Sequence, residues 1–331
     1  MINNKNILGD IFLWFVWFPF RIFIHHLPIK LVNLMGQLGG LALYAFSRKK
    51  RAIMTEELSF LFSHSSSLNQ KEIKKMVYRG LQIFSKRQME NLYWGKMSPQ
   101  LINRMITIEG IAHLEKALQN KGGAILLTAH FGSQQIAPLV LGFKGYKVNI
   151  IAGPPLIEKQ TPIHGKIFKS RSKESKRLPI NFITLDRSKR HLFRALRNNE
   201  ILYIGFDGRE GVNWIPVDFF NHKAFFSPGP IKLSLKTRAP ILPTFIVRQK
   251  DDTHRLIIEP ALELELAEDE KKTLTLNTAK FAKIFEEYIS KYPCHYAMTL
   301  MRMKELMQEG ALESSLFQGH KREVLVKNML K

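Results

Sequence analysis

The pattern of apolar and polar positions changes at two points along the chain. Residues 11–24 (IFLWFVWFPFRIFI) are almost continuously apolar, and residues 31–46 form a second, softer apolar stretch. Between residues 52 and 95 the apolar side chains recur at helical spacing, and from residue 124 onward short apolar runs alternate with helical patterns. Strands that alternate with helices predict an α/β fold, with a mixed, mostly parallel sheet that helices flank.

The same patterns place the individual elements. The expected strands cover residues 124–129, 146–152, 180–185, 201–206, 241–248 and 255–259. The expected helices cover residues 52–62, 70–95, 114–123, 188–199, 230–238 and 275–291. Asn69 is a candidate cap for the second helix. The expected regions are a membrane-anchoring segment (1–51), an α/β domain (52–305) and a basic C-terminal tail (306–331).

The N-terminal apolar run is open to several interpretations. A cleaved signal peptide is disfavoured, because Lys5 is the only basic residue before the run, Asp10 lies at its start, and no A-x-A cleavage site follows. The run is shorter than the roughly 20 apolar residues of a spanning helix, and its tryptophans favour the headgroup boundary. A tilted span, an in-plane hairpin and a buried globular helix remain alternatives. In the first two, the basic cluster 48–51 (RKKR) would face anionic headgroups on the cytoplasmic side.

Charge narrows the range of partners. The chain has 50 Lys plus Arg against 28 Asp plus Glu, a formal net charge of +22. A field of that sign favours nucleic acid, an anionic membrane face or phosphorylated substrates. No zinc-finger, RNA-recognition or leucine-zipper signature accompanies the charge. We therefore expect a membrane and no nucleic acid as partner.

Cysteine and histidine content argues against a bound metal. The single cysteine, Cys294, cannot form an internal disulfide or a cysteine-based zinc site. The 11 histidines include no HExxH or similar ligand spacing. No glycine-rich phosphate loop or dinucleotide fingerprint is present either, so we expect no cofactor.

The stretch 121–135 (KGGAILLTAHFGSQQ) carries the candidate chemistry. A buried strand runs directly into His130, Gly132 lets the chain turn, and Ser133 is positioned to cap a following helix. A histidine at the carboxyl end of a strand lies where α/β sheets bind ligands. With an ordinary pKa near 6.5, it can take a proton from a hydroxyl and return one to a leaving thiol. The alternative is a structural histidine. A nucleophilic Ser133 is disfavoured, because the second glycine of G-x-S-x-G is missing.

This stretch resembles the bacterial lipid A biosynthesis acyltransferases (lauroyl and myristoyl transferases), which belong to the lysophospholipid acyltransferase superfamily. Further segments resemble that family in the same order: 202–209 (LYIGFDGR), 211–220 (GVNWIPVDFF), 227–230 (SPGP), 237–243 (TRAPILP) and 292–293 (YP), with Arg302 nearby. The resemblance covers roughly residues 10–305. It implies a fold like that of glycerolphosphate acyltransferases.

The resemblance also implies an activity. The expected O-acyltransferase moves a fatty acyl group from acyl carrier protein or acyl-CoA to a hydroxyl of an anionic lipid, most simply a lipid A precursor, at the cytoplasmic face of the inner membrane. The family signature is His-x4-Asp/Glu, so His130 becomes the general base and Gln135 the group that orients its imidazole. Backbone amides of 131–134 or a basic side chain would stabilise the oxyanion. The implied substrate-binding residues are Ser133, Arg171, Asp207 and Arg209.

Gln135 is a departure from the family, which has a carboxylate there. A glutamine oxygen can accept the Nδ1 proton but cannot neutralise an imidazolium. The carboxylates that could replace it are Glu158, Asp186 and Asp207. Residues 294–297 (CHYA) depart as well. An amine or lysophospholipid acceptor, or a non-catalytic protein that binds acyl lipid or acyl carrier, therefore remains an alternative.

Overall fold

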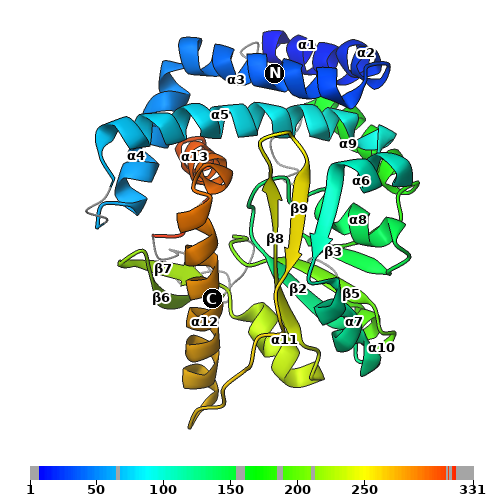
Figure 1. Cartoon of the computed structure of the whole chain (residues 1–331), viewed down its shortest axis with the longest axis vertical. Coiled ribbons are helices and arrows are strands. Elements are labelled where there is room, and N and C mark those ends of the chain that lie inside the picture. The colour runs from blue at the N-terminus through cyan, green and yellow to red at the C-terminus, as the bar shows by residue number, and fades with distance from the viewer. Residues whose placement is uncertain are drawn as a thin grey trace, which may run out of the picture.

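A seven-stranded sheet organises the fold. The computed structural model describes residues 7–64, 68–153, 161–184, 189–209, 213–310, 312 and 315–317. The strand order is β1-β9-β8-β2-β5-β3-β4, and β6 and β7 form a separate two-stranded sheet (Figure 1). Every neighbouring pair in the large sheet is parallel except β8 with β9. The expected mixed, mostly parallel α/β sheet is confirmed.

The strand bounds are β1 (Ile106–Glu109), β2 (Ala124–Thr128), β3 (Val148–Ala152), β4 (Ile180–Thr184), β5 (Ile201–Gly205), β6 (Ile215–Phe219), β7 (His222–Phe226), β8 (Ile241–Arg248) and β9 (His254–Ile258). The sequence pattern predicts all of these except β1 and the β6–β7 hairpin. That hairpin turns at Phe220 and Asn221, whose φ angles are 54° and 59°. Such positive angles suit the tight turns that join two twisted strands.

The helices are α1 (Ile7–Phe15), η2 (Val16–Phe20), α2 (Arg21–His25), α3 (Ile29–Phe46), α4 (Arg48–Leu61), α5 (Gln70–Tyr93), η3 (Trp94–Lys96), α6 (Pro99–Met105), α7 (Ile111–Gln119), α8 (Ala137–Phe143), α9 (Pro162–Ser175), α10 (Arg190–Arg197), α11 (Gly229–Thr237), α12 (Glu270–Lys291) and α13 (Cys294–Gln308). Asn69 caps α5, together with Glu72 in a capping box, as its position predicts. The cap predicted at Ser133 is wrong: a turn follows it and α8 begins only at Ala137. Most of the expected tail, 306–331, lies outside the described residues.

Strand β2 is buried on both faces. Ile125 and Leu127 face one apolar cluster, which includes Phe281 of α12. Ala124 and Leu126 face a second cluster on the other side of the sheet, against α8. A strand that alternates between two cores reads as a continuous apolar run, because neither face meets water. This burial fixes β2 firmly and so fixes the residues that follow it.

The N-terminal helices lie across one end of the molecule, outside α5 (Figure 1). Helix α3 packs closely on α5: a Cβ added at Gly36 would lie 2.7 Å from Cα of Lys86, and one at Gly40 would lie 2.5 Å from Cα of Gln82. The opposite face is exposed and apolar. In the most apolar 18-residue stretch of each segment, only 17% of the residues of Ile7–His25 and 22% of those of Ile29–Phe46 are buried. The buried globular helix is therefore the interpretation that the structure least supports.

Candidate active site

The sheet brings His130 and Asp207 together. Strands β2 and β5 are parallel neighbours, and Thr128 pairs with Gly205 at the end of that register. His130 and Asp207 each follow two residues later, so their side chains meet at the carboxyl edge of the sheet. His130 Nδ1 lies 2.9 Å from Asp207 Oδ1, and the His130 backbone N–H donates to both carboxylate oxygens at 3.0 and 3.1 Å.

Burial and charge give the two side chains different roles. The Asp207 side chain is fully buried, whereas 46% of the His130 side chain is exposed. Burial raises the pKa of Asp207, but the charge of His130 and the hydrogen bonds from His130 and from the Tyr296 hydroxyl (3.1 Å) outweigh it, and the pKa is lowered. The ionised carboxylate accepts the Nδ1 proton, which leaves Nε2 as the proton-accepting nitrogen of the half-exposed ring.

The turn after His130 is held from several sides. Gly132 has φ +56°, and a Cβ there would lie 2.3 Å from the carbonyl oxygen of Ile246, so a larger residue does not fit. The Gly132 N–H donates to the carbonyl of His295 at 3.0 Å. The Thr299 hydroxyl donates to the carbonyl of His130 itself. Because the N–H groups of Phe131 and Gly132 already donate within the protein, these two amides are not available to an oxyanion.

Gln135 does not take the place of the family's acid. Its side-chain oxygen accepts a hydrogen bond from Nε of Arg87 at 3.0 Å. Asp207, from the neighbouring strand, holds the Nδ1 position that the sequence interpretation assigns to Gln135. Burial lowers the pKa of Arg87 to about 10, against the opposing charges of Glu90 and Asp207. Arg87 is thus a cation beside the candidate site that sequence reasoning missed.

Three of the predicted substrate-binding residues have other contacts. The Ser133 hydroxyl is buried and donates to Glu90 at 2.6 Å. Arg209 is buried and donates to the carbonyls of Phe225 (2.7 Å) and Ser315 (3.0 Å), which ties the β5 turn to β7. Arg171 lies on α9 with its guanidinium 5.8 Å from the Trp17 ring centroid. Ser133 and Arg209 are thus engaged within the protein, whereas Arg171 is exposed on α9. Glu158 and Asp186 lie outside the described residues.

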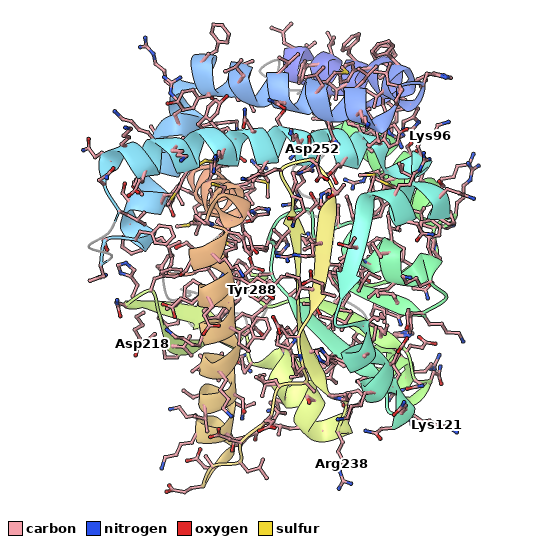
Figure 2. All side chains as sticks on the ribbon, viewed as in Figure 1. Lys96, Lys121, Asp218, Arg238, Asp252 and Tyr288 are labelled. Carbon is pink, nitrogen blue, oxygen red and sulfur yellow. The ribbon has the colours of Figure 1, made fainter. Side chains whose placement is uncertain are left out.

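The partner of the Ser133 hydroxyl, Glu90, belongs to a network of ion pairs that joins α5 to the β8–β9 hairpin. Arg248 pairs with Glu90, and both side chains are at most 4% exposed. Burial raises the pKa of Glu90, but the charges of Arg248 and His254 outweigh it and keep the carboxylate ionised. Asp252, at the tip of the β8–β9 hairpin under α5, accepts from Lys86 at 2.7 Å (Figure 2). Across the described residues, no three His, Cys, Asp or Glu side chains gather closely enough to hold a metal ion.

Comparison with known proteins identifies a family. A family model described as bacterial lipid A biosynthesis acyltransferase matches residues 5–305. The lipid A biosynthesis palmitoleoyltransferase of Escherichia coli (strain K12) is 22% identical over 298 residues, which cover 88% of this chain and 91% of the relative. A lipid A biosynthesis acyltransferase of Shigella flexneri is similar to the same extent, 22% over 298 residues with the same coverage of 88% and 91%.

Proposed function

Because this chain belongs to the bacterial lipid A biosynthesis acyltransferase family, we propose that it transfers a fatty acyl group from an acyl thioester to a hydroxyl of a phosphorylated lipid A precursor. Acyl transfer itself follows from the family. The observation that supports the rest is the hydrogen-bonded pair of half-exposed His130 and buried Asp207. A histidine held in one tautomer by a carboxylate is the arrangement that activates a hydroxyl.

The proposed reaction has two steps. Nε2 of His130 takes the proton of the acceptor hydroxyl while its oxygen attacks the thioester carbonyl carbon, which forms a C–O bond and a tetrahedral oxyanion. Collapse of this intermediate breaks the C–S bond, and the imidazolium returns its proton to the leaving thiolate. The buried carboxylate of Asp207 stabilises the imidazolium between these steps, as a neutral amide could not.

Arg87 is the group that we assign to the oxyanion. Its Nε is bonded to Gln135, and its Nη1 lies 3.5 Å from the sulfur of Met298, a weak acceptor. A guanidinium that is only weakly engaged at one end can donate to charge that develops in the transition state. In this assignment Gln135 positions Arg87 rather than His130.

The apolar helices provide the proposed membrane contact. Exposed apolar side chains line their outer surface: Ile7, Leu8, Ile11, Phe12, Trp14, Phe15, Ile22, Phe23, Leu31, Leu34, Leu38, Leu41 and Phe46. Because α3 lies along α5 instead of projecting from the domain, we propose that residues 7–46 lie in the plane of the inner membrane, on its cytoplasmic face. Of the cluster 48–51, Arg48 and Lys49 are exposed and in this arrangement would meet the headgroups, whereas Lys50 pairs with Glu305 at 2.6 Å.

One assay can test both which molecule donates the acyl group and whether the protein is a catalyst at all. An acidic acyl carrier protein suits the exposed basic residues of α9, which include Lys166, Lys169 and Lys173. The main support for a non-catalytic protein is Gln135, and that support weakens because Asp207 supplies a carboxylate.

The test is acyl transfer by the purified full-length protein in anionic vesicles, with acyl carrier protein or acyl-CoA as donor and the products identified by mass spectrometry. We expect the wild-type protein to acylate the lipid A precursor and His130→Ala to lose the activity. Undiminished transfer by His130→Ala would overturn the mechanism, and no transfer by the wild-type protein from either donor would favour the non-catalytic alternative.

A further inference from the structure

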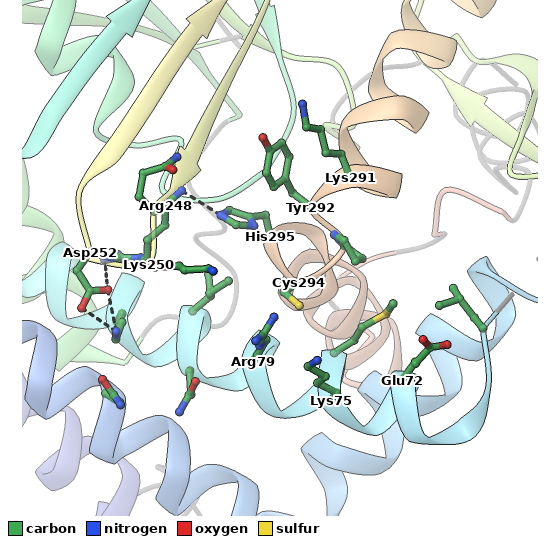
Figure 3. A pocket seen from close by; sticks show the side chains of 18 residues that line it. Glu72, Lys75, Arg79, Arg248, Lys250, Asp252, Lys291, Tyr292, Cys294 and His295 are labelled. Carbon is green, nitrogen blue, oxygen red and sulfur yellow. Dashed lines mark hydrogen bonds and ion pairs between the residues drawn. The ribbon is translucent and has the colours of Figure 1, made fainter.

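A pocket of about 570 Å³ opens between α5, the β8–β9 hairpin and the junction of α12 with α13 (Figure 3). Neither His130 nor Asp207 lines it. Four exposed cations surround it from three sides: Lys75 and Arg79 from α5, Lys250 from the hairpin, and Lys291 from the end of α12. The pocket is therefore lined by residues other than the candidate catalytic pair, and it gathers positive charge of its own.

The acidic residues of this pocket are already engaged. Glu72 accepts the N–H of Asn69 at 3.1 Å in the cap of α5. Asp252 accepts from Lys86 at 2.7 and 2.8 Å and from Arg248 at 3.2 Å. Within the described part of the chain, no carboxylate forms an ion pair with the four surrounding cations. These cations are left for an anion from outside the protein.

The buried wall of the pocket also contains hydrogen-bond donors that have no acceptor within the residues that the structure describes. Nε2 of His295 accepts the backbone N–H of Arg248 at 3.0 Å, so the proton of the neutral ring is on Nδ1. That Nδ1 and Nε of Arg248 are buried and have no hydrogen-bond partner among the described residues. Buried donors without acceptors make the potential of the wall more positive, which further favours an anion.

We propose that this pocket binds the phosphate group of an anionic phospholipid headgroup, at a site separate from the acceptor site at His130. Lysine and arginine side chains that converge on a concave surface suit phosphate oxygens. The inference does not depend on acyl transfer, because none of the residues that carry it belongs to the His130–Asp207 pair.

The position of the pocket argues for a lipid over a free anion. Gln37 of α3 lines the pocket and is exposed. On the same helix, Leu34 and Leu41 lie three and four residues from Gln37 and are exposed as well. Residues three and four apart share one side of a helix. A lipid whose phosphate occupies the pocket could therefore lay its acyl chains along the apolar surface of α3.

The test is calorimetric titration of the detergent-solubilised full-length protein with dihexanoyl phosphatidylglycerol. The comparison ligands are the net-neutral dihexanoyl phosphatidylcholine, inorganic phosphate and acyl carrier protein. The pocket variant is Arg79→Gln with Lys250→Gln. The matched control, Lys116→Gln with Lys271→Gln, removes the same charge from exposed positions on α7 and α12 that do not line the pocket. Unfolding temperatures verify that both variants fold.

We expect phosphatidylglycerol to bind more tightly than phosphatidylcholine, and the pocket variant to raise its Kd by about tenfold or more while the control does not. An equal Kd for both variants, or equal binding of the two lipids, would overturn the proposal. If the protein binds inorganic phosphate but neither lipid, and the pocket variant abolishes that binding, the ligand is a free phosphate and the lipid proposal is overturned. A pocket variant that loses affinity only for acyl carrier protein would assign the surface to that protein instead.

Discussion

Nδ1 of His130 lies 2.9 Å from Oδ1 of Asp207, although 77 residues separate them in the chain. The pairing of β2 with β5 produces this contact, because each residue follows its strand at the same distance. The sheet thus supplies the carboxylate that the family signature places five residues after the histidine. The residue at that position, Gln135, contacts Arg87. Each of these relationships has a measurable consequence.

Gly132→Ala is expected to destabilise the protein and to abolish acyl transfer. The left-handed φ of +56° and the 2.3 Å approach of a Cβ to the Ile246 carbonyl predict a loss of about 1–3 kcal/mol in the free energy of unfolding. Gly122→Ala is the matched control, because its Cβ would meet nothing within 4 Å. Denaturant unfolding of both variants in detergent is the measurement. Equal effects of the two substitutions would show that the turn is not constrained as described.

His295 makes stability depend on pH. Burial, aided by the charges of Arg248 and His254, lowers its pKa to about 3 in the folded protein. The unfolded imidazole has an ordinary pKa near 6.5, so below that pH the unfolded chain binds one more proton and the folded state loses stability. The loss continues until the folded pKa is reached.

The matching variant is His295→Gln, which keeps an acceptor for the Arg248 N–H. Between pH 7.5 and pH 5.5, we expect the wild-type protein to lose about 1 kcal/mol more unfolding free energy than this variant. Other buried groups titrate in both proteins and cancel in the difference. If the unfolding free energies of the two proteins fell equally between pH 7.5 and pH 5.5, His295 would not be buried in its neutral form.

Arg87→Lys tests the oxyanion assignment. An ammonium lacks the planar fork of the guanidinium, and so we expect kcat to fall by about 10- to 100-fold. KM should change little, because the lost interaction forms mainly in the transition state. Arg104→Lys is the control: it makes the same substitution at an exposed arginine of α6 that is not part of the candidate site. A rise in KM with unchanged kcat would make Arg87 a substrate-binding residue instead.

The fold follows from the sequence where a local pattern decides it. The apolar run of β2 and the cap at Asn69 each identify an element without knowledge of its partners. The β6–β7 hairpin is missed because its turn, Phe220-Asn221, lacks the glycine that marks most such turns. Edge strand β1 is missed because its four residues are too few to display a period.

The site follows from the sequence only in part. His130 stands out because it ends a buried strand, and Asp207 stands out as an acid in the turn after another. Their contact could not be derived, since β3 and β4 lie between β2 and β5 in the chain but not between them in the sheet. Arg87 lies on α5, far from His130 in the chain, and only the folded structure brings it near the candidate site. Gln135 is misassigned because the spacing alone does not show which way its side chain points.

The most direct test of the account compares kcat for acyl transfer by Asp207→Asn and Gln135→Ala, in the same vesicles and with the same acyl donor. We expect Asp207→Asn to lower kcat on the order of 10²- to 10⁴-fold, because an amide cannot stabilise the imidazolium or hold the required tautomer. Gln135→Ala should cost less than about tenfold, because its contact is with Arg87. A larger loss for Gln135→Ala than for Asp207→Asn would contradict the assignment of Asp207 as the partner of His130.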